Sequence, residues 1–214
     1  MSAEIFEVYN HRNEHYYSFR ALEFDKDFET YCRWMNQPYV AKWWGFDRSR
    51  EELAKKLIAE LEDKHQHLYI GMINGKPVSY WERYWVEQDI LGTYISAKPF
   101  DQGLHFLIGE SDYLGRTHTS SSIAAFSKLV FQESRTQRII GEPDVNNKQV
   151  LRYAEINCFK HKETVQMPER TSAIMVCERA DFFKKYSTQT NRLYNPTAQT
   201  EKPLHQEAFA VTSI

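Results

Sequence analysis

The stretch that decides the fold is Asp101-Gln-Gly-Leu-His-Phe-Leu-Ile-Gly-Glu110, which is followed by Leu114-Gly-Arg-Thr-His118 and by Glu142-Pro-Asp-Val-Asn-Asn147. Its apolar run predicts a strand over residues 104–108 that carries one histidine, and the glycine turn then opens a helix over residues 117–133. Backbone N–H groups at the start of a helix can bind phosphate groups, and a histidine on a strand can move a proton near pH 7. The order of these elements predicts a site where a phosphate-bearing ligand meets an imidazole and an acid.

The flanking sequence predicts the rest of the fold. Hydrophobic periodicity predicts a helix over residues 25–35, Ser49-Arg-Glu-Glu52 has the pattern of a capping box, and Asn74-Gly75 is typical of a β-hairpin turn. The other expected elements are strands over residues 15–24, 68–73, 77–86, 138–140, 159–165 and 172–178 and a helix over residues 147–157. This order predicts an α/β fold with a mixed, mostly antiparallel sheet flanked by helices. We expect one domain over residues 1–186 and a C-terminal tail, mostly loop, over residues 187–214.

The composition excludes several classes of protein. The 214 residues fit one domain, or one domain with an extension, and 27 basic residues nearly balance 29 acidic ones. Because no long basic block occurs, we expect neither nucleic acid nor a membrane surface as a partner. The spacing of Cys32, Cys158 and Cys177 is neither metal-like nor disulfide-like, so we expect reduced thiols and no metal site. Without a signal-peptide pattern, or an apolar run near the roughly 20 residues that cross a bilayer, a soluble cytoplasmic protein is expected.

Four segments carry a resemblance to a known family. They are Trp34-Met-Asn-Gln-Pro38 with Trp43-Trp-Gly45, Tyr80-Trp-Glu-Arg-Tyr84, Asp101-Gln-Gly-Leu-His-Phe-Leu-Ile-Gly109 and Glu142-Pro-Asp-Val-Asn-Asn147. In these segments, and in the order of elements over about residues 16–180, the chain resembles the GNAT acyl-coenzyme A N-acyltransferases. Within that family it is similar to the siderophore-biosynthesis acyltransferases that make hydroxamates, the N6-hydroxylysine O-acetyltransferase-like enzymes.

The resemblance implies an activity and its surroundings. The activity is transfer of an acyl group (acetyl, succinyl or longer) from acyl-coenzyme A to an N-hydroxylated lysine, ornithine or diamine. The product would be a hydroxamate for siderophore biosynthesis and iron acquisition. An amine N-monooxygenase and a siderophore synthetase are the expected functional neighbours.

The resemblance also implies two catalytic residues. His105 matches the strand histidine that the family uses at the acyl-transfer centre, where it would act as general base toward the attacking N-hydroxyamine. Asp144 matches the family's acid, which would orient the imidazole or bind the hydroxyamino group of the substrate. Each residue has a structural alternative: a packing histidine within a strand, and an aspartate that caps the turn before the next helix.

The resemblance implies that coenzyme A binds along the histidine strand and at the glycine turn. The residues expected to bind it are Phe106, Leu107, Ile108, Leu114, Gly115, Arg116, Thr117, His118, Thr119 and Asn147. Two positions depart from the family pattern: Thr117 replaces a second small residue, and Asp112, which would repel a phosphate that it faced, replaces a Gln or Arg. The family's tyrosine general acid would fall at Ala154, one residue from Tyr153, and one residue turns a helix by about 100°. No general acid is therefore assigned.

Aromatic and acidic side chains predict the site of the acceptor. Because side chains alternate along a strand, Tyr80, Glu82 and Tyr84 share one face of the expected hairpin. An acid beside aromatic rings suits the cationic tail of an amine. We therefore expect Trp44, Glu82 and Tyr84 to bind the substrate, and the alternative for the aromatic residues is packing in the core.

Two other functions are compatible with the sequence. The Trp43-Trp-Gly45 segment also resembles aminoglycoside 6'-N-acetyltransferases, but those enzymes tend to carry an acid where this chain has His105, and their polycationic substrates prefer a more acidic cleft. The departures at Asp112 and Thr117 permit a non-catalytic acyl-coenzyme A-binding module, which the presence of both His105 and Asp144 disfavours. The acyl group, the acceptor and the oligomeric state are open at this point.

Overall fold

The computed structural model describes residues 5–45, 49–187 and 193–194. Within them, nine strands form one sheet in the order β7-β8-β6-β5-β4-β3-β2-β1-β9. The strands are β1 (Ile5–Asn10), β2 (His15–Ala21), β3 (Gln66–Ile73), β4 (Lys76–Trp85), β5 (Gln102–Ile108), β6 (Arg138–Gly141), β7 (Phe159–Gln166), β8 (Thr171–Glu178) and β9 (Leu193–Tyr194). All neighbours are antiparallel except β5 and β6, which run parallel, so the predicted mixed, mostly antiparallel sheet is confirmed.

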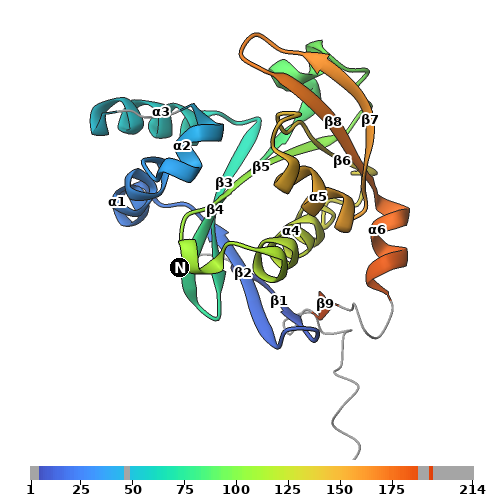
Figure 1. Ribbon diagram of the computed structural model, residues 1–214, viewed down its shortest axis with the longest axis horizontal. Helices are drawn as coiled ribbons and strands as arrows, with labels where there is room; N and C mark the ends of the chain where they lie inside the picture. Colours follow the sequence, from blue (N-terminus) through green and yellow to red (C-terminus); the bar gives the residue numbers. More distant parts are fainter. Residues whose placement is uncertain (1–4, 46–48, 188–192, 195–214) are drawn as a thin grey trace, which may run out of the picture.

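Helices cover both faces of this sheet. They are α1 (Phe24–Met35), α2 (Pro38–Trp44), α3 (Arg50–Glu62), α4 (Arg116–Val130), α5 (Lys148–Ile156) and α6 (Arg179–Tyr186), with short 3₁₀-helices η1 (Val86–Gln88), η2 (Ile90–Thr93) and η3 (Ser111–Tyr113). Figure 1 shows α1, α2 and α3 grouped apart from α4 and α5, with β3, β4 and β5 between the two groups. Every helix of the described residues is too short or too polar to span a bilayer.

The alternation of side chains along β4 and β5 builds the two layers of the core. Tyr80 and Leu107 are buried together with residues of α1, α2 and α3. Their neighbours Trp81 and Phe106 pack in the other cluster, against α4, and the rings of Trp81 and Phe106 stack with centroids 4.7 Å apart. The alternation along β4 therefore places its side chains on the faces that the sequence predicted.

Local signals fix the ends of several elements. Ser49 forms the predicted capping box of α3, because its hydroxyl accepts from the Glu52 amide while the Glu52 carboxylate accepts from the Ser49 amide. Asn74 and Gly75 form the predicted turn between β3 and β4. Pro38, three residues beyond the helix expected over residues 25–35, begins α2, where a proline at the first position leaves no helical hydrogen bond unmade.

Two strands and two α-helices were not predicted, β1, β9, α2 and α6, and neither were the three 3₁₀-helices. β1 precedes the expected first strand and pairs with β2 as a hairpin. β9 lies beyond the domain boundary expected at residue 186 and pairs with β1 through Tyr194 and Leu193. The remainder of the expected tail, residues 188–192 and 195–214, lies outside the described residues.

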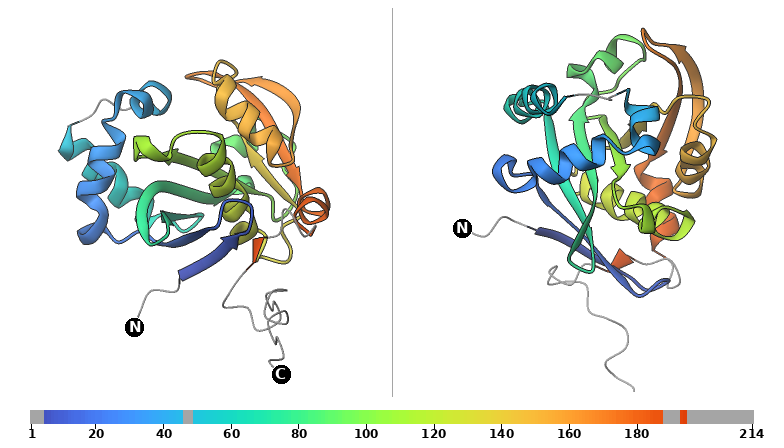
Figure 2. Two further views of the ribbon diagram at one scale, coloured as in Figure 1. Left: turned by 60° about the horizontal axis from the view of Figure 1, so that its bottom comes forward. Right: turned by 60° about the vertical axis from the view of Figure 1, so that its left-hand side comes forward.

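The parallel strands β5 and β6 diverge soon after they meet. Only two pairs join them, Gln102 with Ile139 and Gly103 with Ile140, whereas β4 accompanies β5 as far as Ile108. Beyond that fork, β5 leads through η3 into α4 and β6 leads into α5. The two views of Figure 2 show α4 and α5 beside these strands. The fork leaves a space between the two strands, and ionisable side chains of the candidate site line that space.

Candidate active site

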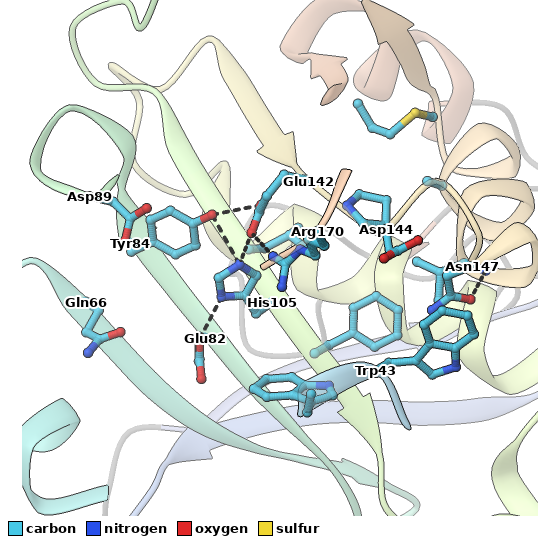
Figure 3. A pocket seen from close by; sticks show the side chains of 18 of the residues that line it. Trp43, Gln66, Glu82, Tyr84, Asp89, His105, Glu142, Asp144, Asn147 and Arg170 are labelled. Carbon is cyan, nitrogen blue, oxygen red and sulfur yellow. Dashed lines mark hydrogen bonds and ion pairs between the residues drawn. The ribbon is translucent and has the colours of Figure 1, made fainter. Parts of the chain in front are cut away.

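A cavity of about 440 Å³ lies at the fork. Residues of α2, α3, β4, β5, α5 and the segment after β6 line it. His105 lies in the middle of the labelled side chains, with Glu82, Tyr84 and Glu142 around it (Figure 3). The cavity therefore brings together elements that are distant in the sequence around the imidazole of His105.

The imidazole of His105 lies between two buried carboxylates. Its Nδ1 is 2.8 Å from Oε2 of Glu82, and its Nε2 pairs with Oε1 of Glu142. The side chain of His105 is 33% exposed, whereas those of Glu82 and Glu142 are 6% and 4% exposed. A carboxylate only accepts hydrogen bonds, and a neutral imidazole has a single N–H to donate. The ring can therefore donate to both carboxylates only when it is protonated, as an imidazolium.

These carboxylates change the proton affinities of all three groups. Burial alone would lower the pKa of His105, but the charge and hydrogen bond of Glu142 and the hydrogen bond of Glu82 outweigh it, and the pKa is raised well above its ordinary value. Burial alone would raise the pKa of Glu142, but the charge of His105 holds it below the usual range, and the pKa of Glu82 is lowered by its hydrogen bond with His105. The resting unit is therefore two carboxylates and one imidazolium, with a net charge of minus one.

Further side chains complete the hydrogen bonds of the two carboxylates. Tyr84 donates its hydroxyl to Oε2 of Glu142 at 3.0 Å, and Arg170 donates to Oε1 at 3.3 Å. Tyr80 donates to Oε1 of Glu82 at 2.8 Å. Burial and the charge of Glu142 raise the pKa of Tyr84 well above its ordinary value, so its hydroxyl stays a donor. Buried charges need such partners, because an uncompensated one costs several kcal/mol.

Strand register brings these groups together. Glu82 on β4 and His105 on β5 are directly opposite each other, and Tyr84 is opposite Gly103. A Cβ atom at Gly103 would lie 2.0 Å from Cζ of Tyr84, so only glycine leaves room for that ring. Glu142 follows β6 directly, on the far side of the fork. Gly103, in the stretch quoted first, is thus required for the position of Tyr84 in the site.

Comparisons with known proteins agree with this geometry. The family model described as the Acetyltransferase (GNAT) domain matches residues 23–167. The chain belongs to the GNAT acetyltransferases. The predicted fold and family are thereby confirmed.

Two relatives of this GNAT chain are similar over most of its length. It is 33% identical to the N(6)-hydroxylysine O-acetyltransferase of Escherichia coli, over 84% of this chain and 58% of that protein. It is 32% identical to the N-hydroxyputrescine acetyltransferase of Acinetobacter baumannii, over 84% of this chain and 85% of that protein. The predicted resemblance to acyltransferases of hydroxylated amines is confirmed, and the chain spans little more than half the length of the first relative.

Solved structures agree on the fold. A protein of Bacillus halodurans, described as uncharacterized, is 35% identical with a TM-score of 0.83, over 87% of this chain and 96% of that one. An aminoglycoside acetyltransferase solved with coenzyme A is 21% identical with a TM-score of 0.68, over 80% of this chain and 99% of that one. At that identity, the likeness to the aminoglycoside enzyme shows the fold alone.

The predicted acid, Asp144, lies in the cavity but does not orient the imidazole. Its carboxylate accepts from the backbone amide of Asn146 at 2.7 Å, which is the turn-capping role that the sequence offered as the alternative. Glu142, two residues earlier, takes the place beside His105. An acceptor-binding role for Asp144 stays a prediction, since its side chain is half-buried in the lining.

The residues predicted to bind the substrate all line the cavity. The ring of Trp44 lies edge-on to that of His105, with centroids 6.2 Å apart. Glu82 bonds directly to the ring of His105, and Tyr84 donates to Glu142, the other partner of that ring. The first role of both residues is therefore to hold the imidazole. Neither Glu142 nor Arg170 was predicted as a site residue, although Glu142 stands in the same quoted segment as Asp144.

The residues predicted to bind coenzyme A divide into two groups. Phe106 and Asn147 line the cavity, and Asn147 also caps α5 by accepting from the amide of Val150 at 3.3 Å. The side chains of Leu107 and Ile108 are buried, so these residues present only their backbone to a ligand. The other predicted residues surround the start of α4, where Leu114 and Thr117 are exposed, His118 is half-buried, Thr119 is buried, Gly115 is the N-cap, and the side chain of Arg116 lies outside the described part.

Proposed function

We propose that this GNAT protein transfers an acyl group from acyl-coenzyme A to the hydroxylated nitrogen of an N-hydroxyamine and so forms a hydroxamate. The observation that carries the proposal is the imidazole of His105, held between the buried carboxylates of Glu82 and Glu142 in a cavity at the fork. The two relatives named for hydroxylysine and hydroxyputrescine acetylation support the choice of acceptor.

The β5 edge and the start of α4 suit the acyl-coenzyme A. Beyond Gly103, β5 pairs with β4 alone among the described strands, so its other edge offers backbone N–H and C=O groups to the amides of the pantetheine arm. The first amides of α4 lack helical partners and suit the pyrophosphate. Gly115, directly before α4, has a φ of 123°, a conformation that only glycine adopts without strain. Acetyl- and succinyl-coenzyme A are the donors that we propose.

The three-residue unit of Glu82, His105 and Glu142 suits the chemistry of a weakly basic nucleophile. As the hydroxylamine nitrogen attacks the thioester carbon, it gains positive charge and becomes acidic. The negative unit stabilises that charge, and we place the proton on Glu142, whose position next to His105 keeps it ionised at rest. The carbon–sulfur bond then breaks, and the thiolate that leaves balances the proton that the nitrogen lost. In this proposal Glu142 takes over the general-base role expected for His105, and His105 is a positioning residue that holds both carboxylates in place.

Neither alternative function has an observation of its own in its favour. The likeness to aminoglycoside acetyltransferases is one of fold. A module that only binds acyl-coenzyme A would have no use for three ionisable groups in a buried cluster, which is costly to desolvate.

The surroundings of the reaction follow from the proposed acceptor. An amine N-monooxygenase must supply the hydroxylated nitrogen, and a siderophore synthetase would consume the hydroxamate for iron acquisition. We propose that the protein works in the cytoplasm, where acyl-coenzyme A is made, and that residues 1–186 form the catalytic domain.

The proposal is tested by a substrate panel. The purified protein is incubated with acetyl- or succinyl-coenzyme A and with N-hydroxyamines, their parent amines or kanamycin, while thiol release and ferric-hydroxamate colour are followed. We expect hydroxamate from the N-hydroxyamines and much slower reaction of the parent amines. Equal rates with the parent amines, or strong activity on kanamycin, would refute the assignment. Calorimetry that detects no binding of either acyl-coenzyme A would remove the enzyme proposal altogether.

A further inference from the structure

One end of the cavity is lined by charged and polar residues that the proposed reaction does not use. Lys56 and Glu60 on α3, His65 and Gln66 at the start of β3, and Asp89 between η1 and η2 line it. Figure 3 places Gln66 and Asp89 on one side of His105 and Asn147 on the other. This end, which we call the tail pocket, therefore lies across the imidazole from the start of α5, away from the proposed acyl-coenzyme A side.

The cavity holds a surplus of negative charge, and in the tail pocket Glu60 and Asp89 outnumber Lys56. Six carboxylates line the whole cavity within the described residues, against three cations, which are Lys56, Arg170 and the imidazolium of His105. Arg170 already pairs with Glu142, and Lys56 with Glu60. A neutral or anionic group that binds here gains little electrostatic stabilisation. A bound cation, in contrast, neutralises negative charge that the protein does not balance itself.

Glu60 offers an acceptor atom for that cation. Its side chain is only 14% exposed, and Lys56 occupies its Oε1. Its Oε2 is buried and has no hydrogen-bond partner among the described residues. Burial and the negative charge of nearby Glu82 raise the pKa of Glu60. A buried carboxylate oxygen without a donor is costly, so a donor from the ligand would be stabilising.

Asp89 adds a second carboxylate at the same end. Its Oδ1 accepts from the backbone amide of Leu91 at 2.8 Å, which begins η2. Its Oδ2 is 3.6 Å from Nε2 of His65, too long for a hydrogen bond. Oδ2 therefore retains capacity to accept from a group in the cavity.

We propose that the tail pocket binds the distal ammonium of an N-hydroxylated α,ω-diamine, with Glu60 as its main partner and Asp89 as its second. The inference rests on the proposed function and narrows its acceptor. An N-hydroxylated amino acid would bring an α-carboxylate into the same end, where the carboxylates repel it and Lys56 is already paired. The decarboxylated acceptor carries the ammonium without that penalty.

Matched acceptors test this choice. N-hydroxycadaverine and N6-hydroxylysine differ only by the α-carboxylate, as do N-hydroxyputrescine and N5-hydroxyornithine. N-hexylhydroxylamine has the shape of N-hydroxycadaverine with a methyl group in place of the ammonium. We expect kcat/KM for the better diamine to exceed that for its amino acid and for the alkyl analogue by at least about tenfold, the value of one charged hydrogen bond.

Substitution of Glu60 identifies the group responsible. Glu60→Gln should raise KM for the better diamine by about 10- to 100-fold and leave KM for N-hexylhydroxylamine nearly unchanged. Glu62→Gln, which removes the same charge from an exposed position on the same helix, should change neither. Asp89→Asn, in which the amide oxygen can still accept from Leu91, provides a second variant with a smaller effect of the same kind and serves if Glu60→Gln does not fold.

The outcomes separate the inference from the function on which it rests. If hydroxamates form with all the N-hydroxyamines at similar kcat/KM, or if the amino acids are preferred, the tail-pocket inference is wrong and the proposed function stands. If Glu60→Gln and Asp89→Asn raise KM for N-hexylhydroxylamine as much as for the diamine, the two residues act on the fold of the cavity and the inference is also wrong. If no hydroxylamine is acylated, both fail.

Discussion

The substitution Glu142→Gln tests the unit around His105 most directly. It keeps the shape of the side chain and removes one charge. The carboxylate of Glu142 accepts from three groups, His105, Tyr84 at 3.0 Å and Arg170 at 3.3 Å. With only 4% of the side chain exposed, water does not replace what is lost. The glutamine oxygen can still accept from one or two of these donors, so the change mainly removes the charge that holds the imidazolium.

These contacts set the expected loss in the free energy of unfolding. Removing one partner of a buried ion pair costs about 3–5 kcal/mol. The loss here should be near 3 kcal/mol, because Glu82 remains bonded to the ring and His105 can release a proton and become neutral. If Glu142 accepts the proton of the attacking nitrogen, turnover should fall by a factor on the order of 10²–10⁴.

Two measurements check both numbers. Urea unfolding at neutral pH gives the loss of stability, and thiol release at saturating N-hydroxyamine gives kcat. Glu155→Gln, at an exposed position of α5, is the matched control and should change neither. A Glu142→Gln protein that keeps near wild-type kcat would refute the catalytic role, and one that unfolds at the wild-type urea concentration would show that the ion pair does not stabilise the fold.

Three further predictions concern single groups. The folded-state pKa of His105 is raised well above 6.5. Its contribution to stability is therefore complete below pH 6.5 and is lost as the pH rises through the raised value. NMR should show that the imidazolium persists above pH 6.5, and a midpoint at 6.5 would contradict this. Gly115→Ala strains a backbone with φ 123° by about 1–3 kcal/mol, so calorimetry should show weaker coenzyme A binding, whereas unchanged affinity would count against the site at α4. Asp144→Asn should raise KM for the acceptor about fivefold, the value of about 1 kcal/mol, and a loss of kcat as large as that of Glu142→Gln would restore Asp144 as the main acid.

The sequence predicted those parts of the fold that depend on local patterns. The period of two along β4 assigned Tyr80, Glu82 and Tyr84 to one face, because strand geometry fixes the alternation wherever the strand lies. The capping box at Ser49 marked the start of α3 for the same reason: its partners lie within four residues. α2 was missed because Pro38 marks both the end of one helix and the start of the next, and the sequence pattern does not say which.

The identity of the acid beside His105 was beyond local patterns. Glu142 and Asp144 are two residues apart, so in extended chain both point to the same side. Which of them reaches the imidazole depends on where β5 and β6 separate, and that is set by only two pairs, at Gln102 and Gly103. The pairing of Glu82 with His105 likewise depends on the register between β4 and β5, which no short motif determines.

The two carboxylates also change the reason for the choice of acceptor. A lone histidine with a pKa near 6.5 would suit a hydroxylamine because of its own basicity. Here His105 is held as an imidazolium and is already protonated, so only the two carboxylates can accept a proton, and their lowered pKa values make them weak bases. Such a unit cannot deprotonate an alkylammonium with a pKa of about 10.4. It can accept a proton from a nitrogen that is already uncharged and becomes acidic only as it attacks, and an N-hydroxylated amine meets that condition while its parent amine does not.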